Sequence, residues 1–265
     1  MGASSEITSE IIALGARLKN SRAVTTLGLY PNFSDYSARQ AEMIRHAEKI
    51  YFPTLFYADL FNAMGKKTFP SFHTYKFAQD KIKQTAMFTL LNIPHPKTRI
   101  FYGKRQKSTI FDHFDFPFIA KIPRGSSMGK GITLIQNNAQ LSKYLDRPGP
   151  AYIQEYLPVK KDMRIIIIGK EPVHYYWRIA PDNDFRTNVS QGGEISFAPL
   201  PRQAIDLALD TALTCGWDDV GIDVIEYKGK FYVLEANMKY GTKGFKQAGI
   251  DYKELMESLI LKGKI

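Results

Sequence analysis

The sequence predicts an α+β fold made of small modules arranged around a central antiparallel sheet. Segments with helical periodicity alternate with strand-like runs up to residue 149, and the rest of the chain is rich in strand-like runs. Breaks rich in proline, serine and glycine punctuate the chain at Pro70-Ser71 and Pro148-Gly149-Pro150. We therefore divide the chain into residues 1–74, 75–149 and 150–265.

The first region predicts a short β-α-β module. Apolar residues at helical spacing predict a helix over residues 5–19, and a strand is expected over 24–30, ended by Pro31-Asn32. Ser34-Asp35 can cap a helix that runs towards residue 50, where a second strand follows at 49–52.

The second and third regions continue with helices and strands separated by turn residues. A helix is predicted over 75–92, because Pro94 and Pro96 cannot continue it. The other predicted helices are 139–144, 201–214 and 252–261, and the predicted strands are 98–102, 116–122, 132–135, 152–156, 163–168, 173–179, 220–227 and 230–236.

Composition places the chain among soluble globular proteins. With 265 residues, 44% apolar and 23% charged, it can bury a sizeable core and is not disordered as a whole. A single cysteine, Cys215, excludes a disulfide framework and a multi-cysteine zinc site. No apolar run is long enough to span a membrane, and the first residues lack the pattern of a secretion signal. We expect a protein of the reducing cytoplasm without a membrane partner.

The formal charge of +10 allows three interpretations: a nucleic-acid surface, a site for an anion such as a nucleotide, or a lysine-rich solvated surface. The basic residues are dispersed and form no polybasic tail. This dispersal, and the lack of an RNA-binding signature, favour a local anion site on a generally basic surface over a nucleic-acid partner.

The strands predicted around Lys228-Gly229-Lys230 bring together three oxygen-bearing side chains. With the turn centred on Gly229, antiparallel pairing places Asp223 opposite Glu235, and Asn237 shares the face of Glu235. Such oxygen ligands suit a hard cation such as Mg²⁺. A solvated outer face of the hairpin is the alternative.

A glycine-rich loop follows the apolar strand that ends at Lys121. Its glycines and serines, Gly125, Ser126, Ser127 and Gly129 among them, can direct backbone N–H groups at phosphate oxygens. The spacing is not that of a Walker A motif, and a surface loop is the alternative.

A polar segment at residues 184–188 is a further candidate. Arg186 can clamp a phosphate and Asn188 can ligate a metal, although an ordinary polar loop would have a similar composition.

The order of the motifs is more specific than any one of them. Along the chain come Asp80-Lys81, Ile93-Pro94-His95-Pro96, Phe118-Ile119-Ala120-Lys121 with its glycine loop, Gln154-Glu155-Tyr156-Leu157, Asp162-Met163-Arg164, Phe185-Arg186-Thr187-Asn188, Val220-Gly221-Ile222-Asp223 and Leu234-Glu235-Ala236-Asn237. Over residues 75–260 this order resembles the ATP-grasp superfamily, and within it the RimK-like carboxylate–amine ligases. The resemblance implies two α+β subdomains that grip ATP, preceded here by the short N-terminal module.

The resemblance also implies a role for each matching residue. Lys81 and Lys121 match the lysines that hold the ATP phosphates, and the loop from Gly125 to Gly131 matches the flap over them. The other matches are Glu155, Tyr156 and Leu157 for adenine, Asp162 for ribose, Arg186, Thr187 and Asn188 for the phosphate side, and Asp223, Glu235 and Asn237 for Mg²⁺, with Mn²⁺ as an alternative metal.

The implied chemistry is phosphorylation of a carboxylate by ATP, followed by attack of an amine on the acylphosphate. We expect Arg178, helped by Arg164 or Lys239, to orient the carboxylate, unless these arginines form internal salt bridges. A nucleotide-binding regulatory protein of the same fold is the alternative function. Members of the family commonly form homo-oligomers. The sequence departs from the family at Met238-Lys239-Tyr240-Gly241, where a small-Ser-Pro-Gly pattern is common, and this leaves the substrates open.

Overall fold

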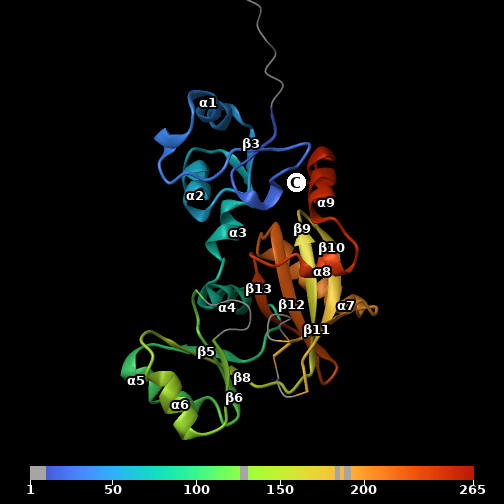
Figure 1. Cartoon of the computed structure of the whole chain (residues 1–265). Helices are drawn as coiled ribbons and strands as arrows, with labels where there is room; N and C mark the ends of the chain where they lie inside the picture. The colour runs from blue at the N-terminus through green and yellow to red at the C-terminus, as the bar shows by residue number, and fades with distance from the viewer. Residues whose placement is uncertain (1–9, 126–130, 183–185, 188–191) are drawn as a thin grey trace, which may run out of the picture.

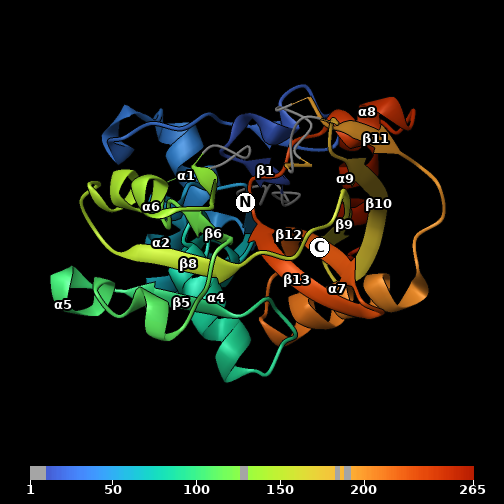
Figure 2. The same ribbon diagram turned by 90° about the horizontal axis from the view of Figure 1, so that it is seen from below.

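The computed structural model describes residues 10–125, 131–182, 186–187 and 192–265, which contain three β-sheets. The N-terminal sheet has the strand order β2-β1-β3-β4, the middle sheet β5-β8-β6-β7, and the central sheet β11-β10-β9-β12-β13. Figure 1 shows the N-terminal sheet with its helices at one end of the molecule and the middle sheet at the other. In both views α4 (Lys81–Leu90) lies between the middle sheet and β13 (Figures 1 and 2).

The N-terminal module is a parallel sheet with two α-helices. Its elements are β1 (Ile12–Ala13), η1 (Ala16–Leu18), β2 (Thr25–Thr26), η2 (Phe33–Asp35), α1 (Ala38–His46), β3 (Lys49–Tyr51), α2 (Leu55–Ala63) and β4 (Lys67–Phe69). The helix predicted over 5–19 is wrong in its described part. Ile12 and Leu14 are fully buried in and beside a central strand, so their burial reflects strand pairing and not a helix face.

The single helix predicted over 75–92 is divided in two. A short helix, α3 (Phe72–Lys76), precedes α4, and between them Gln79 has the left-handed φ of 57°. The Asp80 carboxylate then accepts a hydrogen bond from the Lys83 backbone N–H and caps α4. This break makes Lys81 the first residue of a helix.

The middle sheet is antiparallel and has a hydrophobic core of its own. It contains β5 (Thr98–Phe101), β6 (Phe118–Lys121), β7 (Ile132–Ile135) and β8 (Ala151–Glu155), with α5 (Gly103–Lys107), η3 (Ile110–Asp112) and α6 (Asn138–Leu145). Phe101, Phe118 and Ile135 are buried beneath α6 and η3. The predicted strands at 98–102 and 132–135 are confirmed, and β8 joins this sheet from beyond residue 149.

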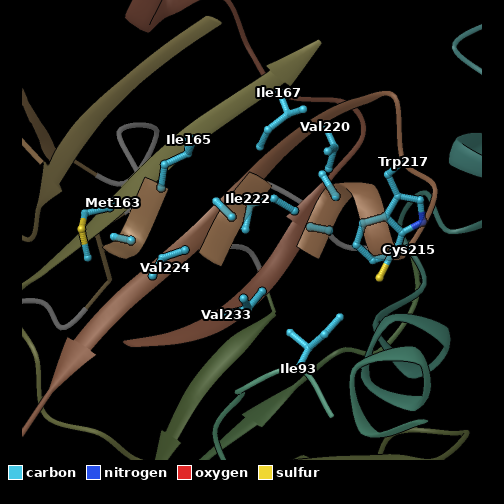
Figure 3. Close-up of a cluster of buried hydrophobic side chains, with 14 of the residues drawn as sticks. Ile93, Met163, Ile165, Ile167, Cys215, Trp217, Val220, Ile222, Val224 and Val233 are labelled. Atoms are coloured by element: carbon cyan, nitrogen blue, oxygen red, sulfur yellow. The ribbon is translucent and has the colours of Figure 1, made fainter. Parts of the chain in front are cut away.

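The central sheet is antiparallel throughout, as predicted. Its strands are β9 (Lys161–Ile168), β10 (Glu171–Ile179), β11 (Glu194–Ser196), β12 (Asp219–Tyr227) and β13 (Lys230–Asn237). On β9, Met163, Ile165 and Ile167 enter the core beneath α7 (Arg202–Thr214), together with Val220, Ile222 and Val224 of β12 (Figure 3). Side chains alternate along a strand, so Asp162 and Arg164 lie on the opposite face.

The β12–β13 hairpin confirms the predicted pairing of Asp223 with Glu235, but for a different reason. The two-residue turn is Lys228-Gly229, both with positive φ, so Tyr227 pairs with Lys230. This register alone would place Leu234 opposite Asp223. An irregularity between the Val224–Val233 and Asp223–Glu235 pairs leaves Leu234 unpaired and advances Glu235 by one position.

The chain ends on the face of the central sheet opposite α7. There α8 (Lys243–Gln247) and α9 (Tyr252–Leu261) pack with the N-terminal module, and the predicted helix over 252–261 is confirmed. Among the described residues, no helix has the length and apolar character to cross a membrane.

Candidate active site

A cleft between the middle and central sheets contains many of the predicted site residues. It encloses about 640 Å³ of empty space, part of it open to solvent. Its lining side chains are Ile119, Lys121, Ile132, Gln154, Tyr156, Leu157, Val159, Asp162, Arg178, Arg186, Thr187, Asp223, Ile225, Leu234 and Glu235. A smaller recess shares Glu235 and adds Lys81, Asn237 and Lys239.

The three predicted metal ligands lie side by side. The Asn237 side-chain amide donates to Asp223 Oδ2 at 3.2 Å and to Glu235 Oε1 at 2.9 Å. Asp223 is 2% exposed, which is uncommon for an aspartate and requires compensating charge. Among the described residues, no group of three or more His, Cys, Asp or Glu side chains could hold a metal, so a cation here would need the Asn237 oxygen as well.

Two lysines from different elements lie near Glu235, and their predicted role in binding the ATP phosphates remains a prediction. Lys81 Nζ, at the start of α4, lies 3.6 Å from Glu235 Oε2, and Lys121 ends β6. Burial alone would raise the pKa of Glu235, but Lys81 and Lys121 lower it to about 2. Burial lowers the pKa of Lys121 to about 8, although Glu235 opposes this shift. The cleft thus contains an ionised carboxylate beside Lys121, which is largely protonated at neutral pH.

The root of the glycine loop fixes these lysines relative to each other. The Lys81 backbone N–H donates to the Pro123 carbonyl at 2.9 Å, and Arg124 Nε donates to Asp80 at 3.0 Å. Gly125, with φ of 67°, donates its backbone N–H to Gln79. These bonds hold the start of α4 against the chain leaving β6.

Two arginines bind the buried carboxylates on the same sheet face. Arg164 donates through Nε and Nη2 to Asp223, the second bond being 2.9 Å long. Arg178 donates to both oxygens of Asp162 at 2.7 and 2.6 Å, and its Nη2 lies 2.8 Å from Asp223 Oδ2. Gly221 permits this arrangement, because a Cβ there would lie 3.0 Å from Arg164 Cδ.

This network corresponds to the internal salt bridges considered as the alternative for Arg164 and Arg178. Arg178 is 4% exposed, and Asp162, expected to bind ribose, instead holds Arg178 and accepts a hydrogen bond from Thr187. Roles for Arg178 in orienting a carboxylate and for Asp162 in binding ribose remain predictions.

Of the segment predicted to meet adenine, Tyr156 and Leu157 line the cleft. The Glu155 carboxylate instead accepts a hydrogen bond from the Lys97 backbone N–H at 2.6 Å. Arg186 and Thr187 also line the cleft. Ser126, Ser127, Gly129 and Asn188 lie outside the described residues.

Sequence reasoning missed the remaining cleft wall, which is mostly apolar. Ile119 could have been found, because it alternates with Lys121 on the same face of β6. Leu234 was missed because the predicted register, with Glu235 opposite Asp223, places the neighbouring Leu234 on the other face of β13. Ile132, Gln154, Val159 and Ile225 complete the missed set.

The RimK-like ATP-grasp domain matches residues 78–260, which is more than half of the chain. The chain belongs to the RimK-like ATP-grasp family. Its motif order therefore identified the family correctly. This family consists of ligases that use ATP, and the ATP-grasp arrangement agrees with the cleft between two sheets described above.

The relatives of this RimK-like chain include named glutamate ligases. A coenzyme γ-F420-2:α-L-glutamate ligase of Methanococcus maripaludis is 29% identical over 71% of this chain and 68% of the relative. A ribosomal protein bS6–L-glutamate ligase of Escherichia coli is 30% identical over 66% of this chain and 60% of the relative. The chain thus spans between three fifths and about two thirds of their length.

Solved structures agree on the fold. A RimK domain ATP-grasp protein from Sphaerobacter thermophilus superimposes with a TM-score of 0.69 at 14% identity, over 94% of this chain and 98% of the other. The predicted ATP-grasp fold is confirmed.

Proposed function

We propose that the protein is an ATP- and Mg²⁺-dependent carboxylate–amine ligase. In the first step a carboxylate oxygen attacks the γ-phosphorus, the bond to the bridging β–γ oxygen breaks, and ADP leaves. In the second step an amine nitrogen attacks the acyl carbon, the bond to the phosphate oxygen breaks, and the nitrogen loses a proton. The products are an amide, ADP and phosphate.

The observation that carries this proposal is the cluster of Asp223, Glu235 and Asn237 facing Lys81 and Lys121. Phosphoryl transfer needs positioning and charge neutralisation more than a protein nucleophile. Lys81 and Lys121 both lie near Glu235 and can contact phosphate oxygens together, and Arg186 lies in the cleft wall. The apolar wall beside them suits the flat faces of a purine base.

The donor set of the cluster fits Mg²⁺ or Mn²⁺. Two carboxylates and an amide oxygen are hard ligands, and the amide N–H bonds to both carboxylates hold the three side chains in one patch. We assign Asp223, Glu235 and Asn237 as the residues that would hold the ion. A bound divalent cation would neutralise charge on the β- and γ-phosphates.

The names of the relatives support L-glutamate, or a similar α-amino acid, as the amine substrate. The carboxylate would then belong to a peptide, a protein or a small metabolite that receives this amino acid. We further propose that the predicted regions 75–149 and 150–265 are the two subdomains that close on ATP, except that β8 at the start of the latter pairs within the middle sheet, with residues 1–74 as a separate module. A cytoplasmic location agrees with the single buried cysteine, and a homo-oligomer is a further part of the proposal.

The test is a reaction containing the full chain, ATP, Mg²⁺, L-glutamate and a library of peptides with free C-terminal carboxylates. We expect ADP and amide product to form together, detected by coupled assay and mass spectrometry. If the carboxylate is labelled with heavy oxygen, one labelled oxygen should appear in phosphate per turnover. Label that stays out of the phosphate would exclude an acylphosphate.

Glu235→Gln supplies the site variant, and Glu226→Gln, an exposed glutamate on the neighbouring strand β12, supplies the matched control. We expect Glu235→Gln to keep its fold and lose at least about a hundredfold in turnover, the scale of one lost transition-state contact. Full activity of Glu235→Gln at limiting Mg²⁺ would contradict the metal assignment. ATP binding without ADP formation for any carboxylate would favour the regulatory alternative.

A further inference from the structure

The segment after Asn237 carries three lysines and no acidic residue. Between residues 238 and 250 these are Lys239, Lys243 and Lys246, which we call the lysine ledge. All three are exposed, and none forms an ion pair with another residue in the described ranges. The inner cations Lys81, Arg164 and Arg178 differ, because each already contacts a carboxylate.

Buried residues in the same segment pack on the rest of the molecule and fix the backbone that carries the three lysines. Tyr240 is 3% exposed, donates its hydroxyl hydrogen to Asp219, and lies 4.7 Å below the Arg17 guanidinium carbon. Gly244 and Phe245 of α8 are buried as well. The buried residues alternate with the lysines, so the backbone that presents the lysines is fixed from both ends.

The anchoring also places the ledge close to the proposed reaction centre. A Cβ at Gly244 would lie 2.4 Å from the Tyr176 ring, so the backbone of α8 touches β10 at this point. Tyr176 precedes Arg178 by two residues on the same strand face, a step of about 7 Å. Figure 1 shows α8 lying over β9 and β10 on the side opposite α7.

We propose that the lysine ledge is a docking surface for an acidic peptide segment whose reactive carboxylate enters the cleft. This inference rests on the proposed ligase function and names the class of its carboxylate substrate. Lys243 and Lys246 are three residues apart on α8, which places their Cβ atoms about 5–6 Å apart. Acidic side chains at every second position of an extended peptide are about 7 Å apart, so two of them can reach both lysines.

Charge complementarity favours this occupant. The lysines lack acidic neighbours in their own segment, and an acidic peptide supplies several carboxylates at once. Each exposed contact is weak, so the surface gains its effect from several contacts made together. Salt should therefore weaken docking, because exposed charges are screened.

Binding of a fluorescein-labelled penta-glutamate peptide with a free C-terminus, followed by fluorescence anisotropy, tests the ledge directly. The variant is Lys243→Gln with Lys246→Gln. The matched control is Lys228→Gln with Lys230→Gln, at the hairpin turn roughly 23 Å away along β13. We expect the ledge variant to bind the peptide about tenfold more weakly, with a shallower salt dependence, and the control to bind like wild type. ATP affinity measured by calorimetry should be unchanged in both.

Equal peptide affinity in the two double variants would overturn the proposal, as would equal binding of penta-glutamine. A single-stranded oligonucleotide that binds the ledge more tightly than the peptide would also overturn it, in favour of a general polyanion surface. Failure of the proposed function is distinguishable, because peptide binding needs no turnover. If wild type ligates an acidic peptide and the ledge variant has the same KM for it, the docking proposal is wrong while the proposed ligase function is supported.

Discussion

Asp219 is a buried carboxyl group whose ionisation should make the stability of the protein depend on pH. It begins β12, is 1% exposed, and accepts a hydrogen bond from the Tyr240 hydroxyl. Burial raises the pKa of Asp219 to about 7, although Arg17 opposes the shift. Arg17 lies over the rings of Tyr240 and Tyr252 at 4.7 and 4.8 Å, so this site joins the N-terminal module to the segment after β13.

The direction of the effect follows from proton binding. A carboxyl group with a higher pKa in the folded chain than in the unfolded chain binds more protons when folded. Its contribution to stability is complete below the unfolded value of 3.8 and is lost as the pH rises through about 7. From these two values the free energy of unfolding should fall by roughly 2.5 kcal/mol between about pH 5 and about pH 8.

Asp219→Asn removes the titration while nearly preserving size, and Asp206→Asn, at a half-exposed carboxylate of α7 that pairs with Arg202, is the control. Urea unfolding of the three proteins across this pH range gives the free energies. We expect the difference between wild type and Asp219→Asn to change by roughly 2.5 kcal/mol, and that for Asp206→Asn to stay constant. A difference for Asp219→Asn that is constant within about 0.5 kcal/mol would show that Arg17 outweighs burial and keeps the carboxylate ionised.

Two further predictions concern the cleft and the segment that carries the lysine ledge. Lys121→Met should weaken ATP binding, measured by calorimetry, by roughly 1.5–3 kcal/mol, the scale of a charged hydrogen bond, whereas Lys143→Met at an exposed position on α6 should leave it unchanged. Equal ATP affinities of the two variants would show that Lys121 does not contact the phosphates. Gly244→Ala should lower the free energy of unfolding in urea by about 1–3 kcal/mol, because the added methyl group overlaps the Tyr176 ring. The methyl group of Gly241→Ala enters open space, so similar stability of the two variants would show that α8 can shift to make room.

The sequence predicted the second half of the chain better than the first for a physical reason. Strands such as β9 and β12 are long enough for their apolar runs to be recognised, and α9 has a clear periodic pattern. Strands β1 and β2 have two residues each and depend on parallel pairing with segments distant in the chain. A local pattern carries no signal for such pairing, so the stretch at 10–19 was misread as helix.

For the site too, contacts between segments close in the chain could be predicted and contacts between distant segments could not. The proximity of Asp223 and Glu235 could be predicted because a short turn connects their strands, whereas their direct pairing depends on the irregularity between Val224 and Asp223. The bond between Arg164 and Asp223 spans 59 residues and depends on how β9 lies beside β12. Without the sheet order, Arg164 and Arg178 could not be assigned to particular carboxylates, and internal pairing stayed an open alternative.

The charge balance of the cleft limits which further anions it can receive. Among the described residues, five cationic side chains and three carboxylates meet there, and five minus three leaves an excess of two positive charges. The cationic residues are Lys81, Lys121, Arg164, Arg178 and Arg186, and the carboxylates are Asp162, Asp223 and Glu235.

A triphosphate with one divalent cation would by itself use this excess, so the cleft has no spare positive charge for the several carboxylates of an acidic acceptor. Any other carboxylates of an acidic acceptor must find cations outside the cleft. On the strand that leaves the cleft at Asn237, the next cations without an acidic partner in the described ranges are those of the lysine ledge. In the proposed substrate site, the cleft therefore receives the reactive carboxylate, and the lysine ledge binds the other carboxylates of the acidic acceptor.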